Sequence, residues 1–174
     1  MISISELNIR HAEPSDYLSI IAVINNWFGG RNVADRLHRL FFTHFRDTSF
    51  VIEKDGFLIG FLVGFLSQTY PNEAYIHFVG VHPDYRKQNI GRTLYNLFFD
   101  EVKKHNRNTI RCIASPVNKL SIAFHLAMGF EIEPGDAEVD GVQVFRNYDG
   151  RGGDRVCFIK NLHIREYMEA MGMV

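Results

Sequence analysis

Residues 76–102 read IHFVGVHPDYRKQNIGRTLYNLFFDEV, and this stretch decides the fold. Its apolar beginning predicts a strand, and the apolar residues Ile90, Leu94 and Phe98 recur at the spacing of a helix. Between them lies the short basic segment 86–91. A strand, a short loop and a helix in this order expose backbone N–H groups and a helix N-terminus, which together suit a pyrophosphate. The stretch therefore predicts a phosphate-binding loop.

The residue types of this loop favour an anion. Gly91 allows a ligand to approach the backbone closely, and Asn89 adopts a positive φ more readily than most non-glycine residues. Arg86, Lys87 and Arg92 add positive charge, and the first turn of the helix contains no acidic residue. The alternative is an ordinary strand-to-helix turn with solvated basic residues. Two other phosphate motifs, GxxxxGKS/T and GxGxxG, do not occur in the sequence.

Outward from this stretch, the apolar periodicity changes between that of strands and that of helices. Strands are expected at residues 7–12, 50–53, 57–67, 74–81, 109–115, 130–132 and 156–159, and helices at residues 16–28, 33–45, 90–104 and 118–128. Residues 134–155 contain Pro134 and several glycines, which predict a long loop or a floppy hairpin. The order of elements predicts an α+β fold in which one central sheet carries helices on both faces.

The composition is that of an ordinary globular protein. The chain has 174 residues and a net charge of −1, a balance that argues against nucleic acid as a partner. Its longest apolar run, residues 57–66, is shorter than the roughly 20 residues that span a bilayer, and the first residues lack a signal-peptide pattern. We therefore expect a cytoplasmic protein without membrane contact. Cys112 and Cys157 are expected to be buried free thiols. No Cys, His or acidic cluster has ligand spacing, so no metal site is expected.

Residues 1–160 are expected to form one domain, since no linker or internal repeat interrupts them. Residues 161–174 are expected to add a C-terminal helical extension, because Ile164, Tyr167 and Met171 recur at helical spacing. This apolar face either folds back onto the domain or meets a second copy of the chain in a homodimer.

Two motifs, in this order, resemble those of the GCN5-related N-acetyltransferase (GNAT) superfamily. The segment 86–91, RKQNIG, resembles the family signature R/Q-x-x-G-x-G/A, and residues 80–86, GVHPDYR, resemble its lead-in V-x-P-x-Y-R. Residues 118–130, NKLSIAFHLAMGF, are similar to the family's N-x-x-A/S-x-x-F/L-Y-x-x-x-G-F. The resemblance extends over residues 7–159. It implies a single mixed, mostly antiparallel central sheet with helices on both faces.

The resemblance implies acetyl-CoA as cofactor, with its pyrophosphate on the backbone amides of residues 87–92. It also implies that the pantetheine arm pairs with the backbone near Val79 and Val81, where the fourth and fifth strands splay apart, and that Asn118 contacts the pantetheine. The cofactor-binding residues expected on this basis are Val79, Gly80, Val81, Arg86, Lys87, Gln88, Asn89, Ile90, Gly91, Arg92, Asn118 and Ser121.

Two positions depart from the family pattern. Asn89 stands where the signature has its first glycine, and it tolerates the same backbone shape at modest strain. His125 stands where the family has a tyrosine that protonates the departing thiolate. A histidine can donate a proton at neutral pH, and it can equally be a packing residue or a contact to CoA.

Acetyl transfer to an amine also requires a base. Some arylalkylamine acetyltransferases of this family carry a histidine at the strand position of His77, so His77 is the expected catalytic base, acting directly or through a water. The two-residue period places Tyr75, His77, Val79 and Val81 on one face of the strand. The alternative is a strand histidine that is merely hydrogen-bonded, with Glu73 and Tyr75 as the next candidates for the base.

The function expected from these observations is transfer of an acetyl group from acetyl-CoA to a primary amine. The acceptor is a small molecule or a peptide, and the charge balance does not choose between them. A second reading is a CoA-binding regulatory module with weak or no catalysis, which the missing motif tyrosine favours.

Overall fold

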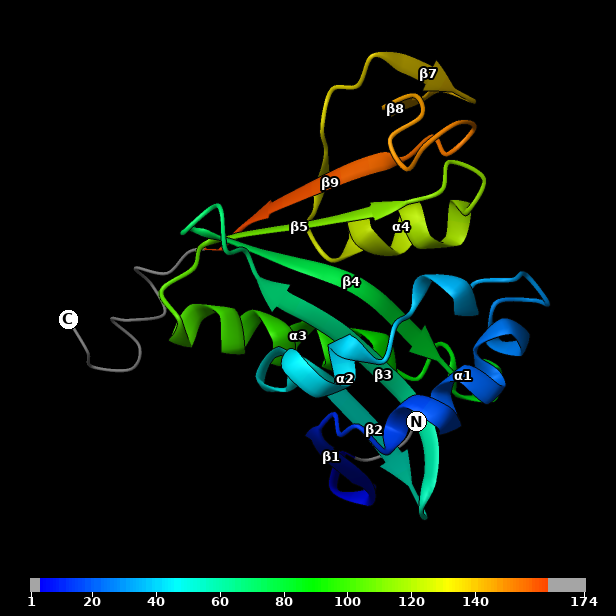
Figure 1. Cartoon of the computed structure of the whole chain (residues 1–174), viewed down its shortest axis with the longest axis vertical. Coiled ribbons are helices and arrows are strands. Elements are labelled where there is room, and N and C mark those ends of the chain that lie inside the picture. The colour runs from blue at the N-terminus through cyan, green and yellow to red at the C-terminus, as the bar shows by residue number, and fades with distance from the viewer. Residues whose placement is uncertain (1–3, 163–174) are drawn as a thin grey trace. The chain divides into compact units, whose positions relative to one another are not determined.

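The computed structural model describes residues 4–162 of the chain, so all but the first two residues of the expected C-terminal extension lie outside the described part. Figure 1 labels the elements along the chain. The strands are β1 (Leu7–His11), β2 (Phe50–Lys54), β3 (Phe57–Leu66), β4 (Glu73–Val81), β5 (Thr109–Ala114), β6 (Glu131–Ile132), β7 (Ala137–Val139), β8 (Val142–Val144) and β9 (Val156–Asn161). The helices are α1 (Asp16–Trp27), α2 (Leu40–His44), α3 (Ile90–Lys104) and α4 (Lys119–Ala127), with short 3-10 turns η1 (Ile4–Glu6), η2 (Ala34–Arg36), η3 (Arg46–Thr48) and η4 (Pro83–Tyr85).

Seven strands form one sheet in the order β1-β2-β3-β4-β5-β9-β6, and β7 and β8 form a separate hairpin. The β1–β2, β2–β3, β5–β9 and β6–β9 pairs are antiparallel, whereas β4 pairs in parallel with β5 through Glu73, Ala74 and Tyr75. The predicted mixed, mostly antiparallel α+β sheet is therefore confirmed.

The described residues divide into two compact units. The first contains residues 4–66 and 76–105, and the second contains residues 67–75 and 106–162. The boundary falls inside β4, so the beginning of this strand belongs to the second unit and the rest to the first. The single domain expected from the sequence stays a prediction.

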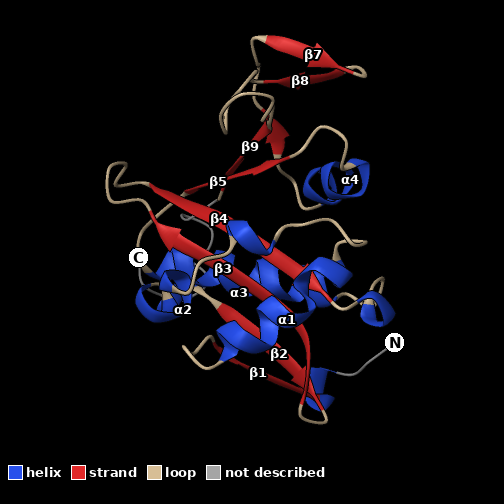
Figure 2. Ribbon diagram, turned by 45° about the vertical axis from the view of Figure 1, so that its right-hand side comes forward, coloured by secondary structure: helices blue, strands red, loops and turns tan. Residues whose placement is uncertain are grey.

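In the first unit, helices cover both faces of the strands, as Figure 2 shows for α1, α2 and α3. Adjacent β3 residues point to opposite faces. Phe61 belongs to the buried cluster built by α1, α2 and the strands, whereas a side chain on Gly60 would lie 2.8 Å from Ile90 on α3. Because Gly60 has no side chain, Ile90, the first residue of α3, can rest directly on the sheet.

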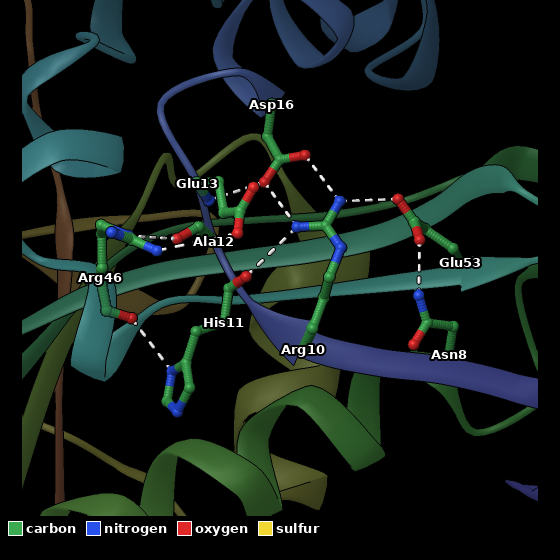
Figure 3. A network of polar contacts seen from close by, with 8 residues as sticks. All are labelled: Asn8, Arg10, His11, Ala12, Glu13, Asp16, Arg46 and Glu53. Atoms are coloured by element: carbon green, nitrogen blue, oxygen red, sulfur yellow. Dashed lines mark hydrogen bonds and ion pairs between the residues drawn. The ribbon is translucent and has the colours of Figure 1, made fainter.

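The first strand and α1 are tied together by a polar network around Arg10 (Figure 3). Its guanidinium donates to both carboxylate oxygens of Asp16 at 2.8 Å and to Glu53 on β2 at 2.7 Å. Asn8 donates to the other oxygen of Glu53 at 2.8 Å. Arg10 therefore joins the edge strand to the first turn of α1 and to the neighbouring strand.

The helix expected over residues 33–45 is wrong in part, because the chain forms η2 and then α2 with an extended residue, Leu37, between them. In a continuous helix the carbonyl of Arg36 would accept from the amide of Leu40. Here that carbonyl accepts from the Nε2 of His77 on β4 at 2.8 Å. The apolar residues Val33, Leu37 and Phe41 are buried as their spacing predicts, although the backbone between them is not helical throughout.

In the second unit, β5 lies between the start of β4 and β9 (Figure 1). Arg111 on β5 bridges two carboxylates, with Nε 2.8 Å from Glu73 and Nη1 2.5 Å from Glu133. Arg107 donates from Nη1 to the carbonyls of Ser67, Tyr70 and Glu73, at 2.9, 2.9 and 3.2 Å. These two arginines fix the loop that enters β4 and the residues that follow β6.

Residues 134–155, expected to form a long loop or a floppy hairpin, contain a hairpin followed by a loop with hydrogen bonds of its own. The β7–β8 hairpin turns at Asp140 and Gly141, both at positive φ, which is the Asp-Gly turn signal that the sequence contained. After it, Arg155 pairs with Asp149 at 2.7 Å, and the side chain of Asn147 accepts from the amide of Gly152 at 2.8 Å. Of the two expected structures, residues 137–144 therefore form the hairpin.

Both cysteines are buried free thiols, as predicted. Within residues 4–162, no helix combines the length and the apolar character that crossing a membrane requires.

Candidate active site

The loop before α3 has the backbone shape that the sequence predicts. Asn89 precedes the helix with φ 66° and ψ 5°, in the left-handed region, and Lys87 has φ 60°. The side chain of Asn89 does not cap the helix. The prediction that Asn89 takes over the conformation of the family's first glycine is consistent with this geometry.

The backbone amides of this loop are available to a ligand. Within the described part of the chain, none of the N–H groups of residues 87–92 has a hydrogen-bond acceptor, and the first paired amide is that of Thr93, which donates to the carbonyl of Asn89 at 2.9 Å. Lys87 and Arg92 are exposed, and no acidic residue lies in the first turn. Consecutive unpaired amides at a helix N-terminus with basic side chains around them suit an anion, and the expected binding of the cofactor's pyrophosphate at this loop stays a prediction.

Arg86 has a different role from the other loop residues. Its Nη2 donates to the carbonyl of Trp27, the last residue of α1, and its Nε lies 3.4 Å from the carbonyl of Val81. The guanidinium thus holds the end of α1 against the loop, at the negative end of the helix dipole. Its expected contact with the cofactor stays a prediction.

The lead-in to the loop is fixed by two residues that the sequence analysis did not single out for this task. The Nδ1 of His82 accepts from the amide of Asp84 at 3.2 Å and so caps η4. The side chain of Gln88 donates to the carbonyl of Asp84 at 3.0 Å. A histidine ahead of Pro-Asp is the signal that could have indicated this cap.

His77 is held on two sides in the first unit. Its ring stacks on Phe41, with centroids 4.1 Å apart, and its Nε2 donates to Arg36. The carbonyl can only accept, so Nε2 carries the proton and the basic lone pair of the neutral ring is on Nδ1. The expected alternation of side chains between the two faces of β4 does not hold here. His77 stacks on Phe41, and its neighbour Phe78 packs against the cluster that contains Phe41.

In the second unit, Asn118 precedes α4 and its side chain accepts from the amide of Ser121 at 3.2 Å. Asn118 is therefore the N-cap of α4, a role typical of asparagine. The geometry explains why this residue type stands at the start of the motif. The expected contacts of Asn118 and Ser121 with the cofactor stay predictions.

His125, in the last turn of α4, is buried. Its Nδ1 is 2.7 Å from the carbonyl of Ser121, and its ring stacks on Phe158 with centroids 4.7 Å apart. Burial lowers the pKa of His125 below its usual value, although the hydrogen bond to Ser121 acts in the opposite direction. Because the carbonyl of Ser121 can only accept, Nδ1 carries a proton that is directed to it. Its role as proton donor stays a prediction.

The structure brings some of the predicted site residues together and leaves others in a separate unit. Val79, Gly80, Val81 and residues 86–92 lie with His77 in the first unit. Asn118, Ser121 and His125 lie in the second. Among the described residues, no group of three or more His, Cys, Asp or Glu side chains could hold a metal ion.

Known proteins share this fold and part of the sequence. The structure of Ard1 from Thermoplasma volcanium is similar with a TM-score of 0.72 and 18% identity, over 90% of this chain and 98% of that chain. The diaminobutyrate acetyltransferase EctA from Paenibacillus lautus, determined with L-2,4-diaminobutyric acid and coenzyme A, is similar with a TM-score of 0.68 and 19% identity, over 91% and 96% of the two chains.

A curated relative is closer in sequence over a shorter range. The L-2,4-diaminobutyric acid acetyltransferase of Nocardia farcinica is 32% identical over 84 residues, which are 48% of this chain. The match spans only 44% of that relative's length. Residues 18–130 match the acetyltransferase (GNAT) family. This range includes the loop before α3, His77, Asn118 and His125. The chain therefore belongs to the GNAT acetyltransferase family, whose cofactor is acetyl-CoA.

Proposed function

We propose that this protein transfers an acetyl group from acetyl-CoA to a primary amine of a small molecule or peptide. The observation that supports this most directly is the loop at the start of α3, where the amides of residues 87–92 lack acceptors within the described chain. Lys87 and Arg92 supply positive charge beside these amides. The site therefore suits a pyrophosphate, the dianionic part of the cofactor that the family uses.

Acetyl-CoA supplies the acetyl group as a thioester. The nitrogen of the acceptor forms a bond to the carbonyl carbon, the bond from that carbon to sulfur breaks, and the amine gives up a proton while the thiolate takes one up. We assign the amine proton to His77, whose Nδ1 carries the basic lone pair. The contacts to Phe41 and Arg36 hold the ring in one orientation, which is what an effective base requires.

The proton for the departing thiolate is less readily assigned to this chain. His125 occupies the position of the family's usual proton donor, but its pKa is lowered by burial and its Nδ1 proton is directed to Ser121. This geometry favours a second candidate function, a CoA-binding module with weak or no catalysis. The two candidates share the loop and differ in whether an acetylated product forms.

The relatives suggest where to look for the acceptor. The Nocardia farcinica enzyme and the Paenibacillus lautus enzyme are named for L-2,4-diaminobutyric acid, a small molecule with two amino groups. We propose a small primary amine of this kind as the first acceptor to test, with peptides that have a free N-terminus as the second class.

The deciding experiment measures thiol release from acetyl-CoA against a panel of diamines, amino acids and peptides, with mass spectrometry of the products. Product formation supports the acetyltransferase. A rise in melting temperature with CoA but no product across the panel supports the binding module. If CoA neither binds nor raises the melting temperature, both proposals are wrong.

A further inference from the structure

A pocket of about 440 Å³ opens in the first unit between α1, the start of β3 and η4. Its volume is in the range of pockets that hold small ligands. The walls contain four aromatic rings, those of Trp27, Phe57, His82 and Tyr85, together with aliphatic side chains, the hydroxyl of Ser19 and one carboxylate, that of Asp84. None of these residues belongs to the proposed cofactor loop or to the proposed base.

Three of the four rings, those of Trp27, His82 and Tyr85, contact one another and form a continuous wall. The ring of His82 meets Trp27 edge to face, with centroids 5.4 Å apart at 74°, and meets Tyr85 in the same way at 5.5 Å and 78°. Trp27 is only 4% exposed, and His82 is fixed by the hydrogen bond from the amide of Asp84. The wall is therefore preformed, and a ligand does not have to order it.

The lining of the pocket contains a carboxylate but no lysine or arginine. The carboxylate is that of Asp84, an exposed residue. Within residues 4–162, this carboxylate makes no hydrogen bond or ion pair. Aromatic faces attract cations through the ring quadrupole, and a carboxylate at the same site adds a direct charge interaction.

We propose that this pocket binds a small organic cation, an ammonium group that carries alkyl substituents. The proposal goes beyond the acetyltransferase function and does not depend on it. An alkylated ammonium combines the apolar surface that the rings prefer with the positive charge that Asp84 prefers. A quaternary ammonium has no N–H to lose, so it cannot be an acetyl acceptor, and its binding tests the pocket alone.

The test uses the intrinsic fluorescence of the protein, because Trp27 is the single tryptophan of the chain and lines the pocket. The full-length protein is titrated with choline and with the uncharged isostere 3,3-dimethylbutan-1-ol. We expect a saturable fluorescence change with choline and affinity at least about 10-fold weaker for the alcohol. The absence of a saturable change with choline, or equal affinity for the two probes, would overturn the proposal.

Two variants and a matched control separate the pocket from general charge effects. Asp84→Asn and Phe57→Ala are expected to weaken choline binding about 10-fold or more, and Phe57 is 73% exposed, so its replacement leaves the core intact. Asp55→Asn removes an equal charge from the exposed turn before β3, which does not line the pocket, and should change the affinity less than two-fold. Equal losses in Asp84→Asn and Asp55→Asn would overturn the assignment.

The response of the melting temperature to CoA is measured on the same variants. A normal CoA response in Asp84→Asn shows that the variant is folded and that its cofactor loop is intact. Choline binding without acetyl transfer leaves the pocket proposal standing and the acetyltransferase proposal wrong. Acetyl transfer without choline binding leaves the acetyltransferase proposal standing and the pocket proposal wrong.

Discussion

The imidazole of His77 lies nearly parallel to the ring of Phe41, with centroids 4.1 Å apart and planes inclined by 14°. At the same time its Nε2 donates to the carbonyl of Arg36 at 2.8 Å. One side chain of β4 is thus positioned by both η2 and α2. This arrangement fixes the tautomer as well as the direction of the ring, and the carbonyl of Arg36 lies where the helix expected over residues 33–45 is interrupted.

Replacing His77 tests its role as base. We expect His77→Ala to lower kcat for acetyl transfer by about 100-fold or more, the usual contribution of a general base, while CoA affinity stays within about two-fold. Steady-state kinetics and calorimetry with CoA measure the two quantities. Phe41→Leu is the control, because it removes the stacked ring but keeps the imidazole and its hydrogen bond to Arg36. If His77→Ala leaves kcat and its pH profile unchanged, the base is another group.

The left-handed conformation at Asn89 predicts how CoA affinity depends on the residue at that position. Asn89→Gly should keep CoA affinity within a few-fold, because glycine adopts φ 66° without strain. Asn89→Val should weaken CoA binding roughly 10-fold or more, since a β-branched residue is strongly disfavoured at positive φ and the amides of the loop would move. Calorimetry with CoA measures both. Equal affinities in the two variants would show that the loop conformation does not control binding.

The Arg10 network predicts a pH-dependent loss of stability (Figure 3). The hydrogen bond from Arg10 lowers the pKa of Glu53. Burial alone would raise the pKa of Asp16, but hydrogen bonds from Arg10 and from the amide of Glu13 outweigh it and lower that pKa as well. Lowered carboxyl pKa values stabilise the fold above the usual value of about 4, and this stabilisation is lost as the pH falls through the values of the folded state.

Arg10→Met should therefore lower the free energy of unfolding at pH 7 by about 2–4 kcal/mol, because it leaves the carboxylate of Asp16, which is 12% exposed, without its cation. The difference from the wild type should shrink as the pH falls below about 4, which denaturant unfolding at several pH values measures. Glu13→Gln is the matched control, since Glu13 and Arg46 form an exposed pair at 3.8 Å that contributes at most about 1 kcal/mol. A constant difference across pH would contradict the network's role.

His125 predicts a second pH effect. Its folded pKa is lowered by burial, so the unfolded chain binds more protons than the folded chain below the usual value of about 6.5. Stability should therefore decrease as the pH falls from about 6.5 toward the folded pKa. His125→Phe, which keeps a ring beside Phe158, should remove this component. If the variant also keeps kcat, then His125 is a packing residue; a large fall in kcat with CoA affinity unchanged would instead assign it the proton transfer.

The burial of both cysteines predicts that the protein's own thiols give no signal in the thiol-release assay. Burial raises the pKa of Cys157 to about 11 and the pKa of Cys112 well above its usual value. Both side chains are at most 5% exposed. We expect neither thiol to react with an aromatic disulfide reagent in the folded protein, and both to react after unfolding. Rapid reaction of either thiol in native buffer would contradict this.

Much of the fold follows from local rules that the sequence displays. The helix of residues 90–104 was predicted to the residue, because its apolar stripe has a 3.6-residue period and Asn89 marks its start. The strands expected at residues 50–53 and 57–67 form β2 and β3, and Asp55 and Gly56 turn the chain between them. The phosphate loop was predicted because its chemistry lies in consecutive residues, whose backbone conformation depends mainly on their own type.

Three expectations were wrong in part or left alternatives open. The helix expected over residues 33–45 is interrupted at Leu37, and the carbonyl just before it, that of Arg36, accepts from a histidine that lies 41 residues further along the chain. For residues 134–155 the sequence left a long loop and a hairpin open, and the chain forms the β7–β8 hairpin around the Asp140-Gly141 turn. The alternation of side chains expected along β4 does not hold at His77 and Phe78, since these neighbouring rings pack against one core.

The sequence by itself determined the family, the cofactor and most of the elements, because each rests on neighbouring residues or on a local period. Only the tertiary structure decided what the single side chains do. Arg86 holds the carbonyl of Trp27, 59 residues away, and the ring of Phe158 covers His125. The aromatic pocket likewise combines α1, β3 and η4. Hydrogen bonds and packing between distant segments depend on the folded chain, and no local pattern contains them.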